Sequence, residues 1–331
     1  MPRPPRFTLA LQDQADPMPL CLFPPGPDGL PPGSLCAHPH FGVHQRLVHA
    51  GLTMTPLDEL PQAQTAIVFT TRSRAQTLGA VAAALGALAP GGRLVLDGAK
   101  GDGIDGLIKT LKQHLSALGT ASRDHGKVAW FTRPVDVPGI TRPWAEAAAP
   151  MRGADGVWRQ AGAFSADGLD PGTALLLEHL PPANPGTVAD FGAGWGGLSL
   201  GLATAFPAAQ LDLIEVDAQA LSLGRRNLEH HSLARFHWAD VTRLPTGLDG
   251  YDLIASNPPF HASRKADPSL GVAFIQAAAR ALSPRGRFAM VANRQLAYEA
   301  TLDGCFAQWD TITQTPTYKI IHASRPHRTP A

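Results

Sequence analysis

Residues 188–201 read VADFGAGWGGLSLG, and this stretch decides the fold of the second half of the chain. It predicts a short apolar strand, a tight turn and then a helix, with the turn formed by Gly192, Gly194, Gly196 and Gly197. A glycine turn between a strand and a helix lets the backbone approach a ligand closely, and the first N–H groups of the helix are free to bind it. The stretch therefore predicts a ligand-binding α/β domain.

Strand-like and helix-like segments alternate on both sides of this turn. Strands are predicted at 186–192, 209–217, 234–240, 251–257, 286–293, 309–315 and 317–324, and helices at 196–206, 218–231, 271–282 and 294–306. Strands that alternate with helices of this length form a doubly wound, mostly parallel sheet of the Rossmann-like kind. The last two strands have no helix between them, so we expect one antiparallel strand among the seven.

The first half of the chain contains a weaker copy of this pattern. ALAPGGRLVLDGAK at 87–100 matches ALSPRGRFAMVANR at 281–294 in its Ala, Leu, Pro, Gly and Arg positions. We interpret this as an internal duplication that gives two tandem α/β domains, 1–150 and 151–331. Residues 133–150 are rich in proline and show no clear periodicity, which places the boundary there. Two unrelated α/β domains that share a Pro-Gly-Gly-Arg turn stay open as the alternative.

Composition excludes several classes of protein. The 331 residues are 44% hydrophobic with a net charge of +1, so neither half is a basic nucleic-acid-binding surface. Cys21, Cys36 and Cys305 form no CxxC pair, which argues against a disulfide framework or a zinc site, and HPHFGVH at 38–44 is interpreted as a loop without a metal. The chain has no apolar run of membrane-spanning length and no secretory leader, so we expect a soluble cytoplasmic protein.

Two acidic residues follow the strands next to the glycine turn. Glu215 ends one strand and can accept hydrogen bonds from ribose hydroxyls, and Asp240 ends the next and can accept one from an adenine amino group. Ligands of open α/β sheets bind outside the carboxyl ends of the strands. Because 192–197 satisfies both the G-x-G-x-x-G and the G-x-G-x-G spacing, these residues fit NAD and S-adenosylmethionine equally, with a structural turn as a third reading.

The sequence SNPPF at 256–260 favours S-adenosylmethionine. The side-chain oxygen of Asn257 and the carbonyl of Pro258 can accept the N–H groups of an exocyclic amine on a nucleobase, while Pro258 and Pro259 fix the backbone. Phe260 can stack on the base. Methyl transfer to such an amine uses these groups and needs no metal, whereas hydride transfer has no use for them. In the first half, TTRSR at 70–74 stands in the corresponding place, so we expect no cofactor there.

Four segments carry a resemblance to a known family: FSADGLDPGTALLL, DFGAGWG, NPPFH and VANRQLAY, at 164–177, 190–196, 257–261 and 291–298. With them the chain resembles the bacterial ribosomal RNA guanine-N2 methyltransferases, the small-subunit 16S enzyme more than the large-subunit one. The resemblance is strong from 163 to 323 and weak before 134. It implies two class I methyltransferase domains, of which the first is a degenerate duplicate without cofactor that binds substrate or stabilises the protein.

The resemblance also implies roles for individual residues. The family's D-x-G-x-G-x-G turn for S-adenosylmethionine maps onto Asp190, Gly192, Gly194 and Gly196, and its acid at the end of the next strand maps onto Glu215, where Asp is more usual. The catalytic tetrapeptide maps onto 257–260. Trp195 departs from the small residue that is usual inside the turn.

The substrate implied is guanine N2 in ribosomal RNA, free or in a ribosomal subunit, and we expect a monomer. Adenine-N6 and protein-glutamine N5 methyltransferases use similar Asn-Pro-Pro-aromatic motifs, but Phe260 and the duplicated domain favour ribosomal RNA. The alternative outside the enzymes is a non-catalytic assembly factor that uses the two domains only to bind RNA. Arg264 and Lys265, just after the catalytic turn, are the first candidates for RNA contacts; weaker candidates are Arg72, Arg74, Arg123, Arg133 and Arg142.

Overall fold

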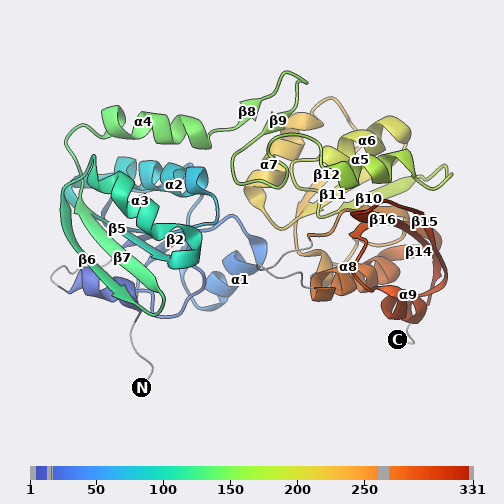
Figure 1. Cartoon of the computed structure of the whole chain (residues 1–331), viewed down its shortest axis with the longest axis horizontal. Coiled ribbons are helices and arrows are strands. Elements are labelled where there is room, and N and C mark those ends of the chain that lie inside the picture. The colour runs from blue at the N-terminus through green and yellow to red at the C-terminus, as the bar shows by residue number, and fades with distance from the viewer. Residues whose placement is uncertain (1–4, 13–15, 17, 260–267, 328–331) are drawn as a thin grey trace. The chain divides into compact units, whose positions relative to one another are not determined.

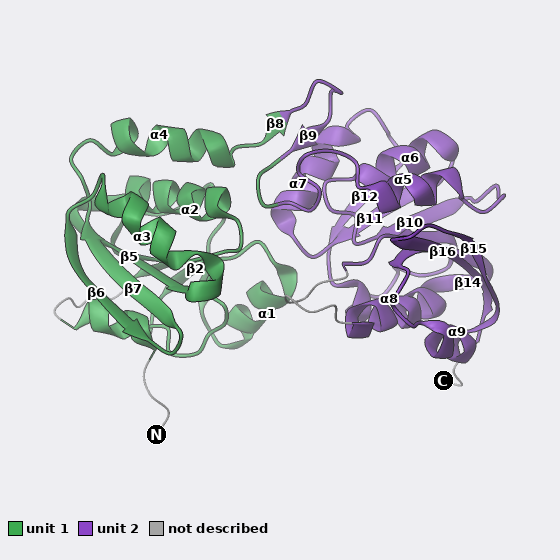
Figure 2. Ribbon diagram, in the orientation of Figure 1, with its two compact units in different colours: residues 1–151, 160–162 green, residues 152–159, 163–331 purple. Residues whose placement is uncertain are grey.

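The computed structural model describes residues 5–12, 16, 18–259 and 268–327. The chain divides into two compact units, 1–151 with 160–162 and 152–159 with 163–331 (Figures 1 and 2). Phe260, Arg264 and Lys265 lie outside the described residues. Each unit is built around one twisted sheet, and we describe the units separately.

The sheet of the second unit has seven strands in the order β12-β11-β10-β13-β14-β16-β15. Strand β16 runs antiparallel to β14 and β15, and the pairs from β12 to β14 are parallel. The strands are β10 (Thr187–Phe191), β11 (Gln210–Glu215), β12 (Ala234–Trp238), β13 (Tyr251–Ser256), β14 (Leu282–Asn293), β15 (Phe306–Gln314) and β16 (Tyr318–Pro326). The predicted fold class, with its single antiparallel strand, is confirmed.

Helices cover both faces of this sheet (Figure 1). One core layer lies under α5 (Pro171–Glu178), α6 (Gly197–Ala205) and α7 (Ala218–Asn227), and the other under η3 (Val241–Arg243), α8 (Pro268–Ala281) and α9 (Glu299–Cys305). Successive residues of β13 feed the two layers alternately: Leu253 and Ala255 join the first, Ile254 the second. Both faces are buried, which is why the strands read as continuous apolar runs.

The helix predicted at 294–306 begins later than expected. Residues 294–298 form a turn, in which the Arg294 N–H donates to the Thr317 carbonyl at 2.8 Å, and α9 starts only at Glu299. The tertiary bond to the β15–β16 connection therefore overrides the local helical pattern at this point.

The first unit repeats the strand order of the second. Its sheet runs β3-β2-β1-β4-β5-β7-β6, with β7 antiparallel to both of its neighbours. The strands are β1 (Leu20–Leu22), β2 (Leu35–Ala37), β3 (Thr53–Met54), β4 (Ala63–Phe69), β5 (Leu88–Ala99), β6 (Ala117–Arg123) and β7 (Gly126–Thr132). Two sheets with one strand order are what the duplication of a domain produces.

The helices of the first unit differ from those of the second in one important place. They are η1 (Arg6–Leu11), α1 (Phe41–His49), α2 (Arg74–Ala87), η2 (Lys100–Asp102), α3 (Ile104–Lys112) and α4 (Val137–Ala148). No helix joins β1 to β2, although residues 23–34 are fully described, whereas α6 joins the equivalent strands β10 and β11. The first unit therefore lacks the helix that follows the glycine turn in the second.

The proline-rich stretch 133–150, for which we predicted no periodicity, contains helix α4. The Asp136 carboxylate caps it by accepting the Gly139 N–H at 2.9 Å, and Pro138 lies in the first turn, where the missing N–H costs nothing. Its buried residues Val137, Thr141 and Trp144 repeat at helical spacing. The prolines obscured this pattern. The stretch then continues into a short hairpin of β8 (Met151–Arg152) and β9 (Trp158–Arg159).

The strand registers align the two sheets residue by residue. In both, the pairing shifts at one irregularity, between Ala63 and Thr65 in β4 and between Tyr251 and Leu253 in β13. Counting on from there, VFTTR at 68–72 corresponds to SNPPF at 256–260, so the predicted correspondence with TTRSR is wrong by two residues. A shift by two keeps the alternation of a strand unchanged, and sequence patterns alone do not detect it.

Candidate active site

The predicted site residues gather at the carboxyl edge of the sheet in the second unit. Strand β10 lies between β11 and β13, so the strand order reverses beside it, and this is where ligands of open α/β sheets bind. Phe191 pairs with Ser256 in the parallel ladder of β10 and β13. The next residues, Gly192 and Asn257, therefore leave adjacent strands side by side, at the strand spacing of about 4.8 Å.

The glycine turn has the backbone that only glycine adopts without strain. Gly192, Gly194 and Gly196 have φ angles of +78°, +56° and +88°. At Gly196 a β-carbon would also lie 3.0 Å from the Leu228 side chain. The N–H groups of Gly192 and Ala193 both donate to the Ile214 carbonyl, which ties the turn to β11. The turn leads directly into α6 and leaves an open cradle at the N-terminus of that helix.

Asp190 lies beneath this turn, and only 1% of its surface is exposed. Its carboxylate accepts the Ser199 hydroxyl of α6 at 2.5 Å. Burial raises the pKa of Asp190 to about 7, the Ser199 hydrogen bond opposes that shift and the charge of Glu215 adds to it. Asp190 therefore links the end of β10 to α6 beneath the glycine turn.

Glu215 stands at the end of β11 with one backbone N–H on each carboxylate oxygen. Gly194 donates to Oε2 at 2.8 Å and Asp217 donates to Oε1 at 2.9 Å. Burial raises the pKa of Glu215, and these backbone hydrogen bonds partly offset the shift. Each oxygen retains capacity to accept a further hydrogen bond.

Asp240 follows β12 and begins η3. Its Oδ1 accepts both the backbone N–H of Thr242, at 2.9 Å, and the hydroxyl of the same residue, at 2.7 Å. Glu215 pairs with Trp238 at the end of β12, and the Ala239 N–H donates to the Glu215 carbonyl at 3.0 Å, so Asp240 lies two residues beyond the strand partner of Glu215. The two acids predicted from the sequence thus occupy neighbouring strand ends.

Asn257 has the most informative contacts in the site. Its Nδ2 donates to Asp170 Oδ1 at 2.9 Å and to Thr173 Oγ1 at 2.7 Å. Its Oδ1 is buried and has no hydrogen-bond partner among the described residues. Buried polar atoms are nearly always paired, so an acceptor beside the glycine turn that has no partner among the described residues is a candidate site for a ligand donor. Pro258 is buried and Pro259 is exposed.

Three comparisons bear on this geometry. The family model described as "methyltransferase small domain" matches residues 155–322, just over half of the chain. The chain belongs to this family. The predicted resemblance is confirmed, and the match covers the glycine turn, Asn257 and the second sheet up to residue 322 in β16.

Individual members of the family can be named. The ribosomal RNA small subunit methyltransferase C of Shewanella oneidensis is 30% identical over 240 residues, 71% of this chain and 69% of that protein. The protein of the same name from Klebsiella pneumoniae is 38% identical over 160 residues, but this match spans only 46% of its length. A T. thermophilus 16S rRNA N2 methyltransferase, solved with AdoMet and guanosine, superposes with a TM-score of 0.78 at 26% identity and covers 95% of this chain and 90% of its own.

Trp195, the residue that departs from the family's usual turn, contacts the segment that precedes α5. Its indole N–H donates to the Phe164 carbonyl at 2.8 Å, its ring lies under the Arg159 guanidinium at 4.8 Å, and it is 4% exposed. The side chain of Asn227 in α7 donates to the Trp195 carbonyl at 2.8 Å. Trp195 thus fastens the segment before α5 to the glycine turn.

In the first unit of this family member, aromatic residues stand where the cradle would be. The registers align Phe23 with Gly192 and His38 with Glu215, and Phe23 keeps the positive φ of +58° although it is not glycine. The two rings meet edge to face at 5.9 Å. Burial, with the charges of neighbouring His and Arg residues, lowers the pKa of His38 to about 4, so it is neutral where Glu215 is an acid.

The His-rich segment 38–44 is only partly the loop that we predicted. His40 caps α1, which already begins at Phe41, by accepting the Gly42 N–H at 3.2 Å. Across the ranges given above, no three His, Cys, Asp or Glu side chains gather closely enough to hold a metal ion. Nor does any described helix have the length and apolar character to cross a membrane.

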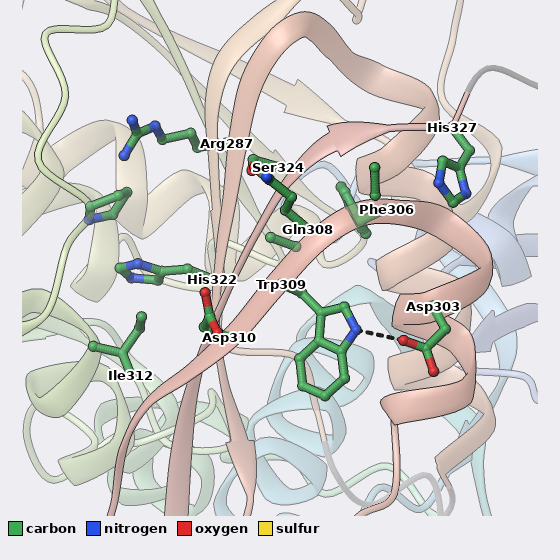
Figure 3. Close-up of a pocket in the computed structure, with 13 residues that line it drawn as sticks. Arg287, Asp303, Phe306, Gln308, Trp309, Asp310, Ile312, His322, Ser324 and His327 are labelled. Carbon is green, nitrogen blue, oxygen red and sulfur yellow. Dashed lines mark hydrogen bonds between the residues drawn. The ribbon is translucent and has the colours of Figure 1, made fainter.

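A large cavity of the second unit lies elsewhere. It has a volume of about 990 Å³ and opens on β15 and β16, with Arg287, Gln308, Asp310, His322 and Ser324 in its wall (Figure 3). Trp309 at its rim donates its indole N–H to Asp303 at 2.8 Å. None of the residues predicted to bind cofactor or substrate lines it. We therefore do not assign this cavity to the candidate active site.

Sequence reasoning missed the contacts of Asp170 and Thr173. The segment DPGT carries part of the family resemblance and predicts the start of a helix, and Asp170 does cap α5 by accepting the Thr173 N–H at 3.0 Å. Asp170 and Thr173 lie 87 and 84 residues before Asn257 in the chain, and nothing in the local pattern joins them. Of the weaker RNA candidates, Arg74 bonds the Thr110 hydroxyl and Arg123 lies 3.3 Å from Asp124.

Proposed function

We propose that this chain transfers the methyl group of S-adenosylmethionine to the exocyclic N2 amine of a guanine in ribosomal RNA, and that this RNA is the 16S RNA of the small subunit. The observation that carries the proposal is the Oδ1 of Asn257, which lies beside the glycine turn and has no hydrogen-bond partner in the part of the chain that the structure describes. The relatives that are named for small-subunit rRNA methylation support the choice of substrate.

The amine of guanine explains why the site needs acceptors. Its nitrogen lone pair is delocalised into the ring, so the amine is planar and a poor nucleophile. Asn257 Oδ1 and the Pro258 carbonyl would accept its two N–H groups, orient the nitrogen and stabilise the positive charge that develops on it. Pro258 and Pro259 restrict the backbone, so the two acceptors are fixed in advance. The excess proton leaves after methylation, when the nitrogen is far more acidic.

The residues around the cradle fit the cofactor. S-adenosylmethionine supplies an electrophilic methyl group on its sulfonium. Gly194 leaves open space at the start of α6, since a β-carbon there would meet nothing within 4 Å, and the positive φ angles of Gly192, Gly194 and Gly196 shape the turn around it. Glu215 would accept hydrogen bonds from the ribose and Asp240 from the adenine amino group. Asp190 would contribute indirectly, because its hydrogen bond to Ser199 stabilises the conformation of the glycine turn.

Phe260, Arg264 and Lys265 complete the proposal from sequence alone. Phe260 would stack on the guanine, and the two cations would contact RNA phosphates next to the site. Since phosphate contacts release counterions, we expect RNA binding to weaken as salt rises. Substitution of both cations by Gln should reduce that salt dependence and leave cofactor binding unchanged.

We further propose that residues 1–150 form a degenerate methyltransferase-like domain that binds no cofactor and serves substrate binding or stability. Phe23 in place of Gly192, His38 in place of Glu215 and a β1–β2 connection without a helix all support this. In keeping with its RNA substrate, we place the protein in the cytoplasm, as a monomer.

The test of function separates the candidate substrates. Small subunits, large subunits and total protein from cells without the gene are each incubated with radiolabelled S-adenosylmethionine and the protein. We expect label in small-subunit RNA, recovered after nuclease digestion as N2-methylguanosine. Label in large-subunit RNA would change the target and keep the chemistry, while label in protein, or in no fraction, would overturn the proposal. Light scattering under the same conditions measures the oligomeric state.

A further inference from the structure

The start of α5 supplies both of the hydrogen-bond partners that the Asn257 amide has among the described residues. Both hydrogens of Nδ2 have acceptors there, Asp170 Oδ1 at 2.9 Å and Thr173 Oγ1 at 2.7 Å. Thr173 is 4% exposed, and the same Oδ1 of Asp170 caps the helix. The orientation of the amide is thus set by residues outside the Asn-Pro-Pro-Phe motif.

These contacts make the two ends of the amide inequivalent. A flipped amide would place Oδ1 against the Asp170 carboxylate, where two acceptors repel each other, and would direct Nδ2 to the place where Oδ1 now has no partner among the described residues. A donor at that place would repel the N–H groups of a substrate amine. The contacts with Asp170 and Thr173 therefore decide whether Asn257 presents an acceptor or a donor to the site.

The carboxylate also changes the strength of the acceptor. A hydrogen bond from Nδ2 to a charged oxygen polarises the amide and increases the negative charge on Oδ1. An acceptor polarised in this way stabilises a positive charge that develops on a substrate nitrogen more strongly than a free amide does.

We propose that Asp170 and Thr173 are positioning residues for the methyl transfer, which fix and polarise Asn257 so that its Oδ1 faces the amine to be methylated. The inference rests on the function proposed above. Its competitor is a purely structural role, in which Asp170 only caps α5 and Thr173 only fills space under it.

A matched pair at Thr173 separates the two roles. Thr173→Val keeps the shape and the backbone N–H that Asp170 caps, but removes the Oγ acceptor; Thr173→Ser keeps the acceptor and removes a methyl group. We expect Thr173→Val to lower the single-turnover rate of methylation by about tenfold or more, with the affinities for S-adenosylmethionine and RNA unchanged, and Thr173→Ser to restore most of the rate. Equal rates for the two variants, or losses that follow their melting temperatures, would overturn the proposal.

Asp170 offers a second pair. Asp170→Asn keeps an oxygen for the helix cap and for Nδ2 but removes the charge, and Asp170→Ala removes both. We expect the methylation rate to fall in both variants, less in Asp170→Asn than in Asp170→Ala. If Asp170 only capped the helix, Asp170→Asn would keep the wild-type rate.

A spectroscopic readout keeps this inference separate from the proposed function. In ¹⁵N-labelled protein without ligand, the two side-chain amide protons of Asn257, assigned by comparison with Asn257→Ala, should be well separated and protected from exchange. One of them should move in Thr173→Val and not in Thr173→Ser. Unmoved protons would refute the positioning contacts themselves. If they move as expected while Asn257→Ala remains fully active, the function proposed for Asn257 fails instead.

Discussion

The nitrogen and the oxygen of the Asn257 side chain differ in their contacts. Its nitrogen has two intramolecular acceptors, while its oxygen is buried without a partner among the described residues. An unsatisfied buried acceptor costs about 1–3 kcal/mol, so the fold carries this cost in the absence of a donor. A substrate amine would remove it. Binding of the amine would thus recover the free energy that burial of this oxygen costs on folding.

Replacement of Asn257 by Ala tests this at the same scale. We expect methylation to fall below detection, because one of the two acceptors and the polarised amide are lost together. Calorimetry should show S-adenosylmethionine binding with unchanged affinity, since the glycine turn and Glu215 remain. A variant that no longer binds cofactor would show that Asn257 belongs to the cofactor site instead.

The buried carboxyl of Asp190 predicts a pH dependence of stability. Its pKa, raised by burial to about 7, exceeds that of about 3.9 in the unfolded chain, so the folded state binds the proton more tightly. Its contribution to stability is therefore full at low pH and is lost as the pH rises from about 4 to about 7. The side chain of Asp190→Asn cannot ionise, so the free energy of unfolding of this variant, relative to that of the wild type, should increase as the pH rises through this window.

We expect that relative gain to be about 2–4 kcal/mol in urea denaturation across the window. Glu215, whose pKa burial also raises, faces Asp190, so Glu215→Gln should show a part of the same effect. Parallel stability curves for wild type and Asp190→Asn would contradict the shifted pKa.

At the scale of elements, short segments of irregular chain hold the site together. The β9 segment is fastened to α7 by Asn227, whose side chain accepts the Trp158 N–H at 2.7 Å and donates to the Trp158 carbonyl at 2.9 Å. Trp195 then fixes Phe164 a few residues later. These contacts hold the stretch that leads to Asp170, so the orientation of Asn257 depends on a chain segment without regular structure.

Trp195→Phe tests that dependence. The variant keeps an aromatic ring near Arg159 but loses the indole N–H and part of a buried ring, so we expect stability to fall by about 1–3 kcal/mol while hydrogen exchange in residues 160–168 becomes faster. Trp309→Phe is the matched control, because it loses an indole hydrogen bond to Asp303 far along the chain. Faster exchange in both variants would point to general loosening rather than to the Trp195 contact.

At the scale of the whole molecule, one topology occurs twice with different contents. In the second unit the carboxyl edge carries glycines, Glu215 and Asn257; in the first, the registers put Phe23, His38 and Phe69 at the same positions. The strand order is set by apolar patterning, which both halves keep. The ligand groups are at strand ends, which can change without loss of the sheet.

The contrast between the units predicts the stoichiometry of the cofactor. Titration calorimetry should give one S-adenosylmethionine per chain, and Glu215→Ala should weaken that single event by about tenfold or more, because buried hydrogen bonds to an acid are lost. A second binding event, or one untouched by Glu215→Ala, would place a cofactor in the first unit. Phe23→Ala serves as the control and should leave the binding unchanged.

The sequence by itself determined the alternation of strands and helices, the glycine turn, the presence of one antiparallel strand and the Asn-Pro-Pro motif. These follow from local periodicity and from residues with special backbone preferences, which act over a few positions. The family resemblance added the substrate class and the match of the glycine turn and Glu215 to an S-adenosylmethionine motif. It could not reveal α4, whose helical spacing was hidden by prolines, or the two-residue offset between the copies.

Only the tertiary structure decided which way Asn257 faces, why Trp195 is tolerated in the turn and what fills the edge of the first sheet. Each depends on contacts between segments that the sheet brings together, such as Asp170 and Asn257, 87 residues apart. A local pattern fixes the conformation of a segment, but the partner of a polar atom is chosen by packing over the whole unit. The motif thus supplies the amide that we propose as an acceptor for the substrate amine, and the fold determines its orientation.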